Sequence, residues 1–253
     1  MEFRPLKPWI IRPRPNPKAA LRLLCFPYAG AGASAFRTWP DALPASVEVF
    51  AIELPGRDTR AKERPLQQMS GLVTALADAI DPVLKAPFAI YGHSLGARIG
   101  FALARELRRR ARPAPAQLFV SGHRAPQLPD PAPMSALSEA QLIARLRRLG
   151  GIPDAVLDDA ELVAYFLPII RADIGLLETE VYDDQPPLAC PITAFGGVTD
   201  ERATIEELDA WREQTSAEFE REMFPGGHFF IQTARSAVLG SLSQQLTRLT
   251  ATL

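Results

Sequence analysis

The chain has 253 residues and a formal net charge of −1, and 47% of its residues are hydrophobic. A chain of this length and composition is expected to form a single domain over residues 1–253, with a sizeable core. The near-neutral charge argues against a nucleic-acid partner, and no apolar run approaches the ~18 residues of a membrane span. We therefore expect a soluble, cytoplasmic protein with neither nucleic acid nor membrane as a partner.

The first 18 residues contain five prolines. These prolines interrupt the continuous apolar stretch that a signal peptide needs. We predict an extended, proline-stiffened arm that lies along the surface of the domain. Trp9 and Ile10 are the residues expected to anchor it.

Beyond the arm, short apolar runs alternate with stretches of helical spacing. The predicted strands cover residues 21–26, 47–54, 87–91, 117–122, 191–195 and 218–224. The predicted helices cover residues 36–41, 70–84, 98–110 and 204–214, with a closing helix that ends near residue 249. This alternation predicts an α/β fold with a mainly parallel central sheet flanked by helices.

One interval, residues 123–189, interrupts this alternation and is far longer than an ordinary crossover. A capping box opens a predicted helix over residues 138–149, which ends at two glycines. A second helical pattern, over residues 158–181, contains Pro168, which should kink it. We predict that this insertion, the lid segment, is a helical lid over a hydrophobic substrate channel.

Residues 92–96 read Gly-His-Ser-Leu-Gly and follow a predicted strand. This is the G-x-S-x-G pattern of a nucleophile elbow, in which a serine sits on a sharp turn between a strand and a helix. Glycines at 92 and 96 remove the Cβ atoms that would clash in such a turn. The first N–H groups of the helix would then lie beside Ser94 and favour an oxyanion there.

Asp200 and His228 each follow the end of a later predicted strand. Ligands of parallel sheets bind at the carboxyl ends of strands, and the chain order Ser, Asp, His is that of α/β-hydrolases. We predict that Ser94 is the nucleophile, His228 its general base and Asp200 the group that orients the imidazole. The oxyanion hole is assigned to the backbone N–H groups of Leu95 and of Ala29, in the first Gly/Ala loop.

Other side chains compete for these roles. His93 neighbours the nucleophile but is expected to pack beneath the elbow, and His123 is a weaker alternative base. Asp173 and Asp183 lie in the predicted lid and rank below Asp200 as the acid.

Several further features have simpler interpretations. The Gly/Ala loop over residues 27–34 lacks the third glycine of a dinucleotide site, and no acidic residue other than Glu53, which precedes a Leu-Pro-Gly turn, stands where a ribose partner belongs. Cys25 and Cys190 lie in apolar runs and are expected to be buried, inert thiols, and no Cys/His spacing suggests a metal. The arginine-rich stretch 105–112 is interpreted as a solvated helix end, with partner docking as the alternative. We therefore expect neither a cofactor nor a metal.

Four motifs together resemble type II thioesterases, the stand-alone editing enzymes of polyketide and nonribosomal peptide synthesis. They are Phe26-Pro27-Tyr28-Ala29-Gly30, Glu53-Leu54-Pro55-Gly56-Arg57, Gly92-His93-Ser94-Leu95-Gly96-Ala97 and Gly226-Gly227-His228-Phe229-Phe230. The chain is similar also to the medium-chain thioesterase that acts with animal fatty acid synthase. The family commonly has a second glycine directly after Tyr-Ala-Gly, where this chain has Ala31.

The resemblance implies the α/β-hydrolase fold, and we expect a monomer that needs no cofactor. It implies hydrolysis of acyl groups from the phosphopantetheine arm of acyl or peptidyl carrier proteins. Such hydrolysis clears aberrant or stalled acyl units, or releases intermediates. It also implies a triad of Ser94, Asp200 and His228, oxyanion donors at Ala29 and Leu95, and a helical lid.

Three alternatives stay open at this point. A general carboxylesterase would cleave simple oxygen esters faster than pantetheine thioesters. An acyltransferase of the same fold would need a lid that excludes water. A binding or scaffold protein would keep the fold without turnover. The sequence carries no prediction of the preferred acyl chain.

Overall fold

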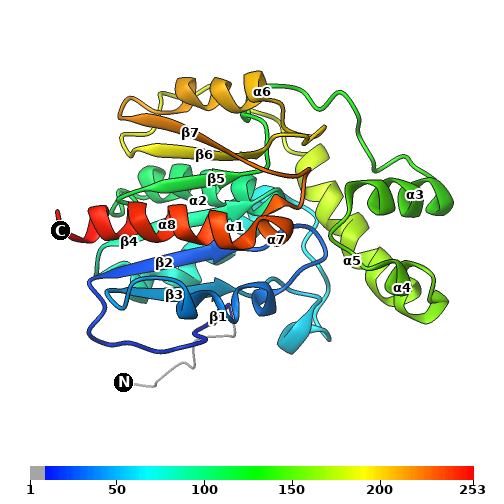
Figure 1. The fold of residues 1–253 in the computed structure, drawn as a ribbon, viewed down its shortest axis with the longest axis horizontal. Coiled ribbons are helices and arrows are strands. Elements are labelled where there is room, and N and C mark those ends of the chain that lie inside the picture. The colour runs from blue at the N-terminus through cyan, green and yellow to red at the C-terminus, as the bar shows by residue number, and fades with distance from the viewer. Residues whose placement is uncertain (1–8) are drawn as a thin grey trace.

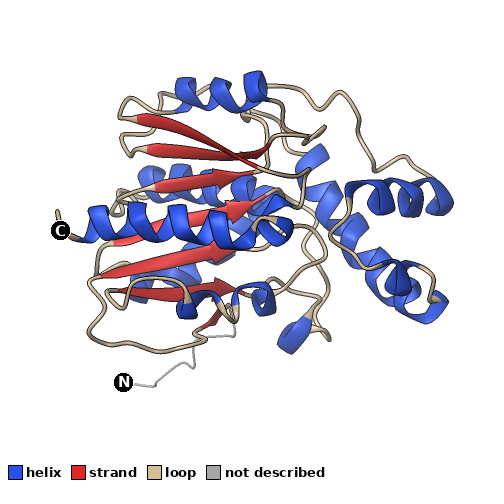
Figure 2. Ribbon diagram, in the orientation of Figure 1, coloured by secondary structure: helices blue, strands red, loops and turns tan. Residues whose placement is uncertain are grey.

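The computed structural model describes residues 9–253. These residues form a seven-stranded sheet in the order β1-β3-β2-β4-β5-β6-β7 (Figure 2). The strands are β1 (Ile10–Ile11), β2 (Leu21–Phe26), β3 (Val47–Ile52), β4 (Phe88–His93), β5 (Leu118–Ser121), β6 (Ile192–Gly197) and β7 (Phe219–Phe224). Neighbouring strands from β3 to β7 pair in parallel, and β1 pairs antiparallel with β3. The prediction of a mainly parallel sheet is confirmed.

Helices cover both faces of this sheet (Figure 1). They are α1 (Met69–Ile80), α2 (Leu95–Arg109), α3 (Glu139–Leu149), α4 (Asp154–Leu157), α5 (Ala160–Glu178), α6 (Ile205–Asp209), α7 (Phe230–Thr233) and α8 (Arg235–Thr250). One core cluster joins the sheet to α1, α2 and α6, and a second joins its other face to α7 and α8. Because both faces are covered, β2 to β6 are almost wholly buried and mostly apolar, with Arg22 and Glu48 as charged exceptions in β2 and β3.

The predicted helix over residues 36–41 is wrong. Two short 3-10 turns stand there instead, η1 (Ala33–Phe36) and η2 (Trp39–Asp41). Pro40 has no N–H to donate to a helix, and it disfavours the α conformation at the residue before it. The turns still bury Phe36 and Trp39 against the sheet. The apolar pattern therefore predicts which side chains pack into the core, but not the type of secondary structure that carries them.

Other helix boundaries differ for related reasons. The helix predicted over residues 70–84 ends at Ile80 and continues as a 3-10 turn, η4 (Asp81–Val83), which contains Pro82. The helix predicted to 214 ends at Asp209 and finishes as the 3-10 turn η5 (Ala210–Gln214). Helix α4 was not predicted, because four residues are too few to show a periodicity.

The N-terminal arm contains a strand that the sequence did not predict. β1 pairs Ile10 with Ile52 and so extends the sheet by one antiparallel strand. Trp9 is buried, as predicted, and its carbonyl accepts the N–H of Glu53 at 2.9 Å. The guanidinium of Arg60 lies 3.9 Å from the centre of the Trp9 ring. The rest of the predicted arm, residues 1–8, lies outside the described residues.

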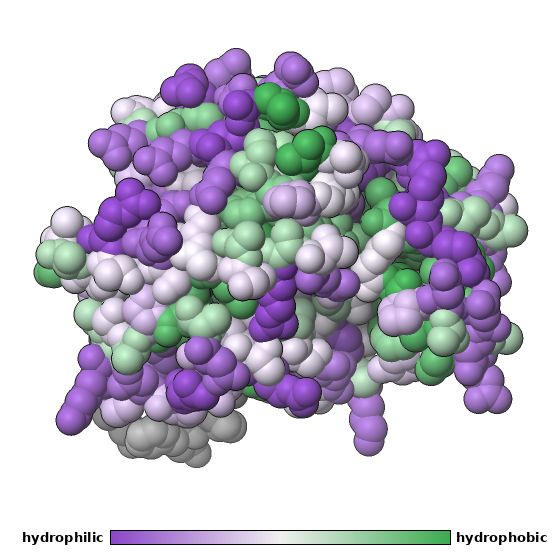
Figure 3. All heavy atoms as spheres, in the orientation of Figure 1, coloured by the Kyte–Doolittle hydropathy of each residue, from purple (hydrophilic) through white to green (hydrophobic). Residues whose placement is uncertain are grey.

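The lid segment contains α3, α4 and α5 and lies beyond the carboxyl ends of the strands (Figure 1). The predicted capping box is confirmed, since Ser138 and Gln141 bond each other's backbone at the start of α3. These helices bury a small apolar cluster of their own, which includes Leu142, Ile170 and Ile174. Figure 3 shows apolar side chains gathered between these helices and the body of the molecule.

Both cysteines are buried and unpaired, as predicted, and burial raises the pKa of the Cys190 thiol to about 11. Such thiols are poor nucleophiles near neutral pH. Within residues 9–253, no helix combines the length and the apolarity needed to cross a membrane.

The arginines at the end of α2, which the sequence analysis interprets as a solvated surface, form hydrogen bonds within the protein. Arg109 and Arg110 donate to Glu106, and these hydrogen bonds lower the pKa of that carboxyl to about 2. Arg105 and Arg108 instead donate to backbone carbonyls of residues 183–187. They tie the segment that leaves the lid helices to the body of the protein.

Candidate active site

The turn between β4 and α2 is built as a nucleophile elbow. Ser94 has φ 53° and ψ −116°, a backbone conformation that non-glycine residues rarely adopt. A Cβ atom on Gly92 would lie 2.1 Å from the carbonyl oxygen of Gly96. A Cβ on Gly96 would lie 2.1 Å from the carbonyl oxygen of Phe26. Both glycines are therefore required by the close approach of backbone, as the motif predicts.

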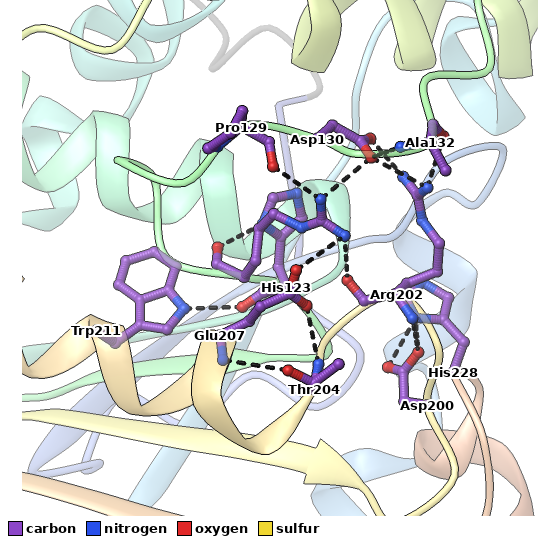
Figure 4. A network of polar contacts seen from close by, with 11 residues as sticks. His123, Pro129, Asp130, Ala132, Asp200, Arg202, Thr204, Glu207, Trp211 and His228 are labelled. Atoms are coloured by element: carbon purple, nitrogen blue, oxygen red, sulfur yellow. Dashed lines mark hydrogen bonds and ion pairs between the residues drawn. The ribbon is translucent and has the colours of Figure 1, made fainter.

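Ser94, His228 and Asp200 form a hydrogen-bonded chain at the carboxyl ends of β4, β7 and β6. The distance from Ser94 Oγ to His228 Nε2 is 3.0 Å, and His228 Nδ1 lies 2.9 Å and 3.2 Å from the Asp200 oxygens. A carboxylate only accepts, so Nδ1 carries the proton and Nε2 is free to accept the serine hydroxyl. Figure 4 shows the His228–Asp200 contact together with the neighbouring polar side chains of His123, Asp130 and Arg202.

The loops after β6 and β7 hold this pair through backbone contact. A Cβ on Gly197 would lie 2.4 Å from the carbonyl oxygen of Gly227, so the two loops pack without side chains between them. Asp200 Oδ1 also accepts the N–H of Arg202 at 2.8 Å. The Asp200 carboxylate is therefore held by a hydrogen bond within its own loop as well as by the imidazole of His228.

The predicted oxyanion donors, Ala29 and Leu95, come from two elements, and Ala29 lines the same cavity as Ser94. Leu95 is the first residue of α2, and Ala29 lies in the turn after β2, where the N–H of Ala31 bonds the carbonyl of Tyr28 at 3.0 Å. Across residues 9–253, neither Ala29 N–H nor Leu95 N–H has a protein acceptor. Both are thus available to an oxygen bound beside Ser94.

His93 is fully buried, as the sequence analysis expects. Its Nδ1 lies 2.9 Å from Ser121 Oγ, and its ring packs on the backbone of Gly122. Burial lowers its pKa well below the usual value, and the nearby His228 adds to that effect. The ring is therefore a neutral packing element rather than a proton acceptor for Ser94.

This buried imidazole makes stability depend on pH. The folded-state pKa of His93 is depressed, so the unfolded chain binds a proton first as the pH falls. His93 should therefore lower the free energy of unfolding below about pH 6.5, by up to ~1.4 kcal/mol per pH unit. Urea unfolding at pH 7.5 and 5.5 measures this, and His93→Gln should reduce the dependence by the His93 share, while His123, whose pKa is also lowered, keeps its own. An equal loss in both proteins would contradict the assignment to His93.

His123, the weaker candidate base, is occupied elsewhere. Its Nδ1–H donates to the carbonyl of Arg124 at 2.8 Å, and its own carbonyl accepts the indole N–H of Trp211 (Figure 4). Burial, reinforced by Arg98, lowers its pKa well below the usual value. No carboxylate of the described residues hydrogen-bonds this imidazole.

We expect His123→Ala to retain most activity, with a loss below about tenfold, because the ring lines the cavity without contacting Ser94. His228→Ala, measured beside it, should lose at least ~10³-fold, as removal of a triad member does. Steady-state hydrolysis of an acyl thioester checks both. Losses of equal depth would overturn the assignment of the base.

A cavity of about 390 Å³ opens at the triad. Its lining includes Tyr28, Ala29, Ser94, His228 and Phe229. The lid segment adds a set of apolar side chains to the lining: Met134, Leu146, Leu149, Ile152, Ile170, Ile174 and Leu177. Such a lining suits the hydrocarbon part of a ligand.

A charged wall completes the cavity. Asp130 accepts from Arg124 at 3.2 Å and from Arg202 at 2.7 Å (Figure 4). On α2, Arg98 donates to Glu180 at 2.6 Å. These charges are thus paired within the protein, whereas Glu178, which also lines the cavity, accepts the backbone N–H groups of Met134 and Ser135.

The two lower-ranked aspartates lie away from the imidazole of the triad. Asp183 accepts from the Gln185 amide on the exposed connector after α5. Asp173 is buried and pairs with Arg57, at 2.6 Å and 2.8 Å. The sequence analysis gave Arg57 no function, although a lone carboxylate on an apolar helix face signals a buried partner.

Fold and site together define the class, which is that of the α/β-hydrolases. Residues 21–246 match the family model of the thioesterase domain, and the chain belongs to this thioesterase family. It is 44% identical over 239 residues to the gramicidin S biosynthesis protein GrsT of Aneurinibacillus migulanus, covering 94% of this chain and 93% of that protein.

Solved structures agree with this assignment. RedJ, a thioesterase from the prodiginine pathway of Streptomyces coelicolor, superposes with a TM-score of 0.86 at 42% identity, covering 89% of this chain and 90% of RedJ. BorB, a type II thioesterase from the borrelidin biosynthetic cluster, superposes with a TM-score of 0.85 at 36% identity, covering 94% and 97%. The predicted resemblance and the predicted thioesterase activity are confirmed at the level of the family.

Proposed function

We propose that this thioesterase hydrolyses acyl groups from the phosphopantetheine arm of acyl or peptidyl carrier proteins. It would remove aberrant or stalled acyl units, or release intermediates, in polyketide or nonribosomal peptide synthesis. The observation that carries the proposal is the Ser94–His228–Asp200 chain, which opens onto a cavity with an apolar wall. The biosynthetic pathways named for GrsT, RedJ and BorB support the substrate class.

The chemistry follows from the geometry. Ser94 Oγ attacks the thioester carbonyl while His228 Nε2 takes its proton, and Asp200 stabilises the imidazolium through Nδ1–H. The tetrahedral oxyanion accepts hydrogen bonds from the N–H groups of Leu95 and Ala29. The tetrahedral intermediate then expels the pantetheine thiolate, to which His228 returns the proton. Water attacks the acyl-serine in the same way, and no cofactor or metal enters these steps.

The lid segment, residues 123–189, belongs to the same domain in this proposal. It covers the acyl chain and limits the access of water while the thioester is bound. The enzyme acts as a monomer in the cytoplasm and takes its substrate from a separate carrier protein.

Hydrolysis of a carrier protein loaded with short acyl groups tests the proposal directly. Intact-protein mass spectrometry reports the free carrier thiol, and Ser94→Ala serves as the control. Release of the thiol by the wild type alone supports both substrate and nucleophile. Cleavage of a p-nitrophenyl ester without cleavage of the carrier thioester would favour a general carboxylesterase. Transfer of the acyl group to an added acceptor would favour an acyltransferase.

A further inference from the structure

The buried ion pair between Arg57 and Asp173 joins the loop after β3 to the lid helix α5. The two side chains meet in a bidentate contact, with Nη1 to Oδ2 at 2.6 Å and Nη2 to Oδ1 at 2.8 Å. Arg57 is 4% exposed and Asp173 is fully buried. Neither residue lines the cavity at the triad. The pair is therefore placed to act on something other than the bound acyl chain.

Both members of the pair also hold the loop that carries Ala29. Asp173 Oδ2 accepts the N–H of Gly30 at 2.8 Å, and Arg57 Nη1 donates to the carbonyl of Ala31 at 3.2 Å. One carboxylate from the lid segment and one guanidinium thus grip two successive residues next to the oxyanion donor.

The direction of the Ala29 N–H follows from this grip. Ala31 N–H bonds the carbonyl of Tyr28 at 3.0 Å, which closes the turn, and Gly30 has φ +78° within it. In a trans peptide the carbonyl and the N–H point in opposite directions. The bond to the Tyr28 carbonyl therefore aims the Ala29 N–H to the other side, and any release of Gly30 or Ala31 would let that peptide turn.

Helix α5 presses on the same turn with an apolar side chain. A Cβ on Gly30 would lie 2.8 Å from Ile170 Cγ1, so a side chain at this position would force Ile170 to move. Ile170 and Asp173 are three residues apart and share one face of α5. The packing of α5 against the body of the protein therefore also orders the turn that carries Ala29 and Gly30.

We propose that Asp173 and Arg57 are positioning residues that complete the oxyanion hole when α5 is seated. The proposal rests on the oxyanion role of Ala29 given above. A buried ion pair is weak evidence for stability in itself, and fixing one geometry is its best-attested use. Here the geometry fixed is that of a hydrogen-bond donor needed most in the transition state.

Asp173→Asn tests this. The amide keeps the shape and one acceptor but loses the charge that grips Arg57, so the turn should loosen. We expect kcat on an acyl-pantetheine thioester to fall about 10- to 100-fold, part of the ~10²–10³ that complete loss of one oxyanion donor costs. The affinity for an alkyl boronic acid, whose serine adduct needs the oxyanion hole, should fall in parallel. KM, and the Kd of a non-hydrolysable thioether analogue, should change less than about threefold.

Glu48→Gln is the matched control. Glu48 is also a buried carboxylate paired with an arginine, Arg12, but it lies at the amino end of β3, away from the site. It should leave kcat and boronate affinity unchanged. Arg57→Lys is the second variant, because lysine keeps the charge but cannot make the bidentate contact and reach Ala31 as well. It should show the same pattern as Asp173→Asn.

Three outcomes separate the possibilities. Unchanged kcat and boronate affinity in either folded variant would overturn the inference while leaving the thioesterase proposal intact. A loss explained by a lower active fraction in circular dichroism and phosphonate titration would make the pair a structural anchor only, which also overturns it. If the wild type cleaves no carrier or pantetheine thioester, the proposed function fails, and boronate affinity of the variants still decides the oxyanion role.

Discussion

Replacing Ser94 by alanine is expected to lower turnover of an acyl thioester by at least ~10⁴-fold, as loss of the nucleophile of a triad does. Among the described residues, Ser94 supplies the only hydroxyl that contacts His228 Nε2, at 3.0 Å, and it lines the cavity. Alanine adopts the same strained backbone and gives up a single hydrogen bond. The free energy of unfolding should therefore change by no more than about 1 kcal/mol.

Mass spectrometry of the acyl-carrier substrate measures turnover, and urea unfolding followed by circular dichroism measures the fold. Ser236→Ala is the control, because Ser236 is an exposed serine on α8 that does not line the cavity. It should match the wild type in both measurements. Residual turnover of Ser94→Ala above one hundredth of the wild type would show that another group serves as the nucleophile. Loss of the folded signal would show that Ser94 has a structural role.

The parts of this protein that the sequence predicts well are those with a local steric or periodic demand. The elbow needs glycine at 92 and 96 because backbone atoms approach within 2.1 Å of the missing Cβ positions. β4 is buried along its whole length, so its apolar run is visible without any knowledge of its neighbours. Asp200 and His228 were found because the ends of parallel strands share one edge of the sheet.

The parts that the sequence does not predict depend on partners far along the chain. β1 has two residues and exists because β3 offers it an edge. Arg57 and Asp173 are 116 residues apart, and nothing in either local pattern names the other. In the sequence, Arg105 and Arg108 resemble a solvated helix end, whereas in the folded protein they donate to carbonyls of the connector at residues 183–187. Such pairings follow from tertiary structure and leave little local signal.

Asp200→Asn is expected to lower kcat by about 10³- to 10⁴-fold near neutral pH. Asparagine keeps an oxygen that can accept the Arg202 N–H, now at 2.8 Å, so the loop after β6 should hold its shape. It cannot balance a positive charge on His228, and its amide N–H₂ can turn toward Nδ1 and favour the tautomer that cannot accept from Ser94. KM should change little, because the carboxylate faces the imidazole rather than the acyl chain.

Asp183→Asn provides the comparison that makes this result specific. Asp183 is one of the two lid-segment aspartates that the sequence offers as alternatives to Asp200. It lies on the connector after α5, where its carboxylate contacts Gln185. Its loss should leave kcat within about twofold of the wild type, as for a surface substitution away from the site. A tenfold or smaller effect of Asp200→Asn would mean that the imidazole is oriented without this carboxylate. Because His228 Nδ1 lies 2.9 Å from Asp200, that result would have to come from a rearranged loop, which a crystal structure of the variant would reveal.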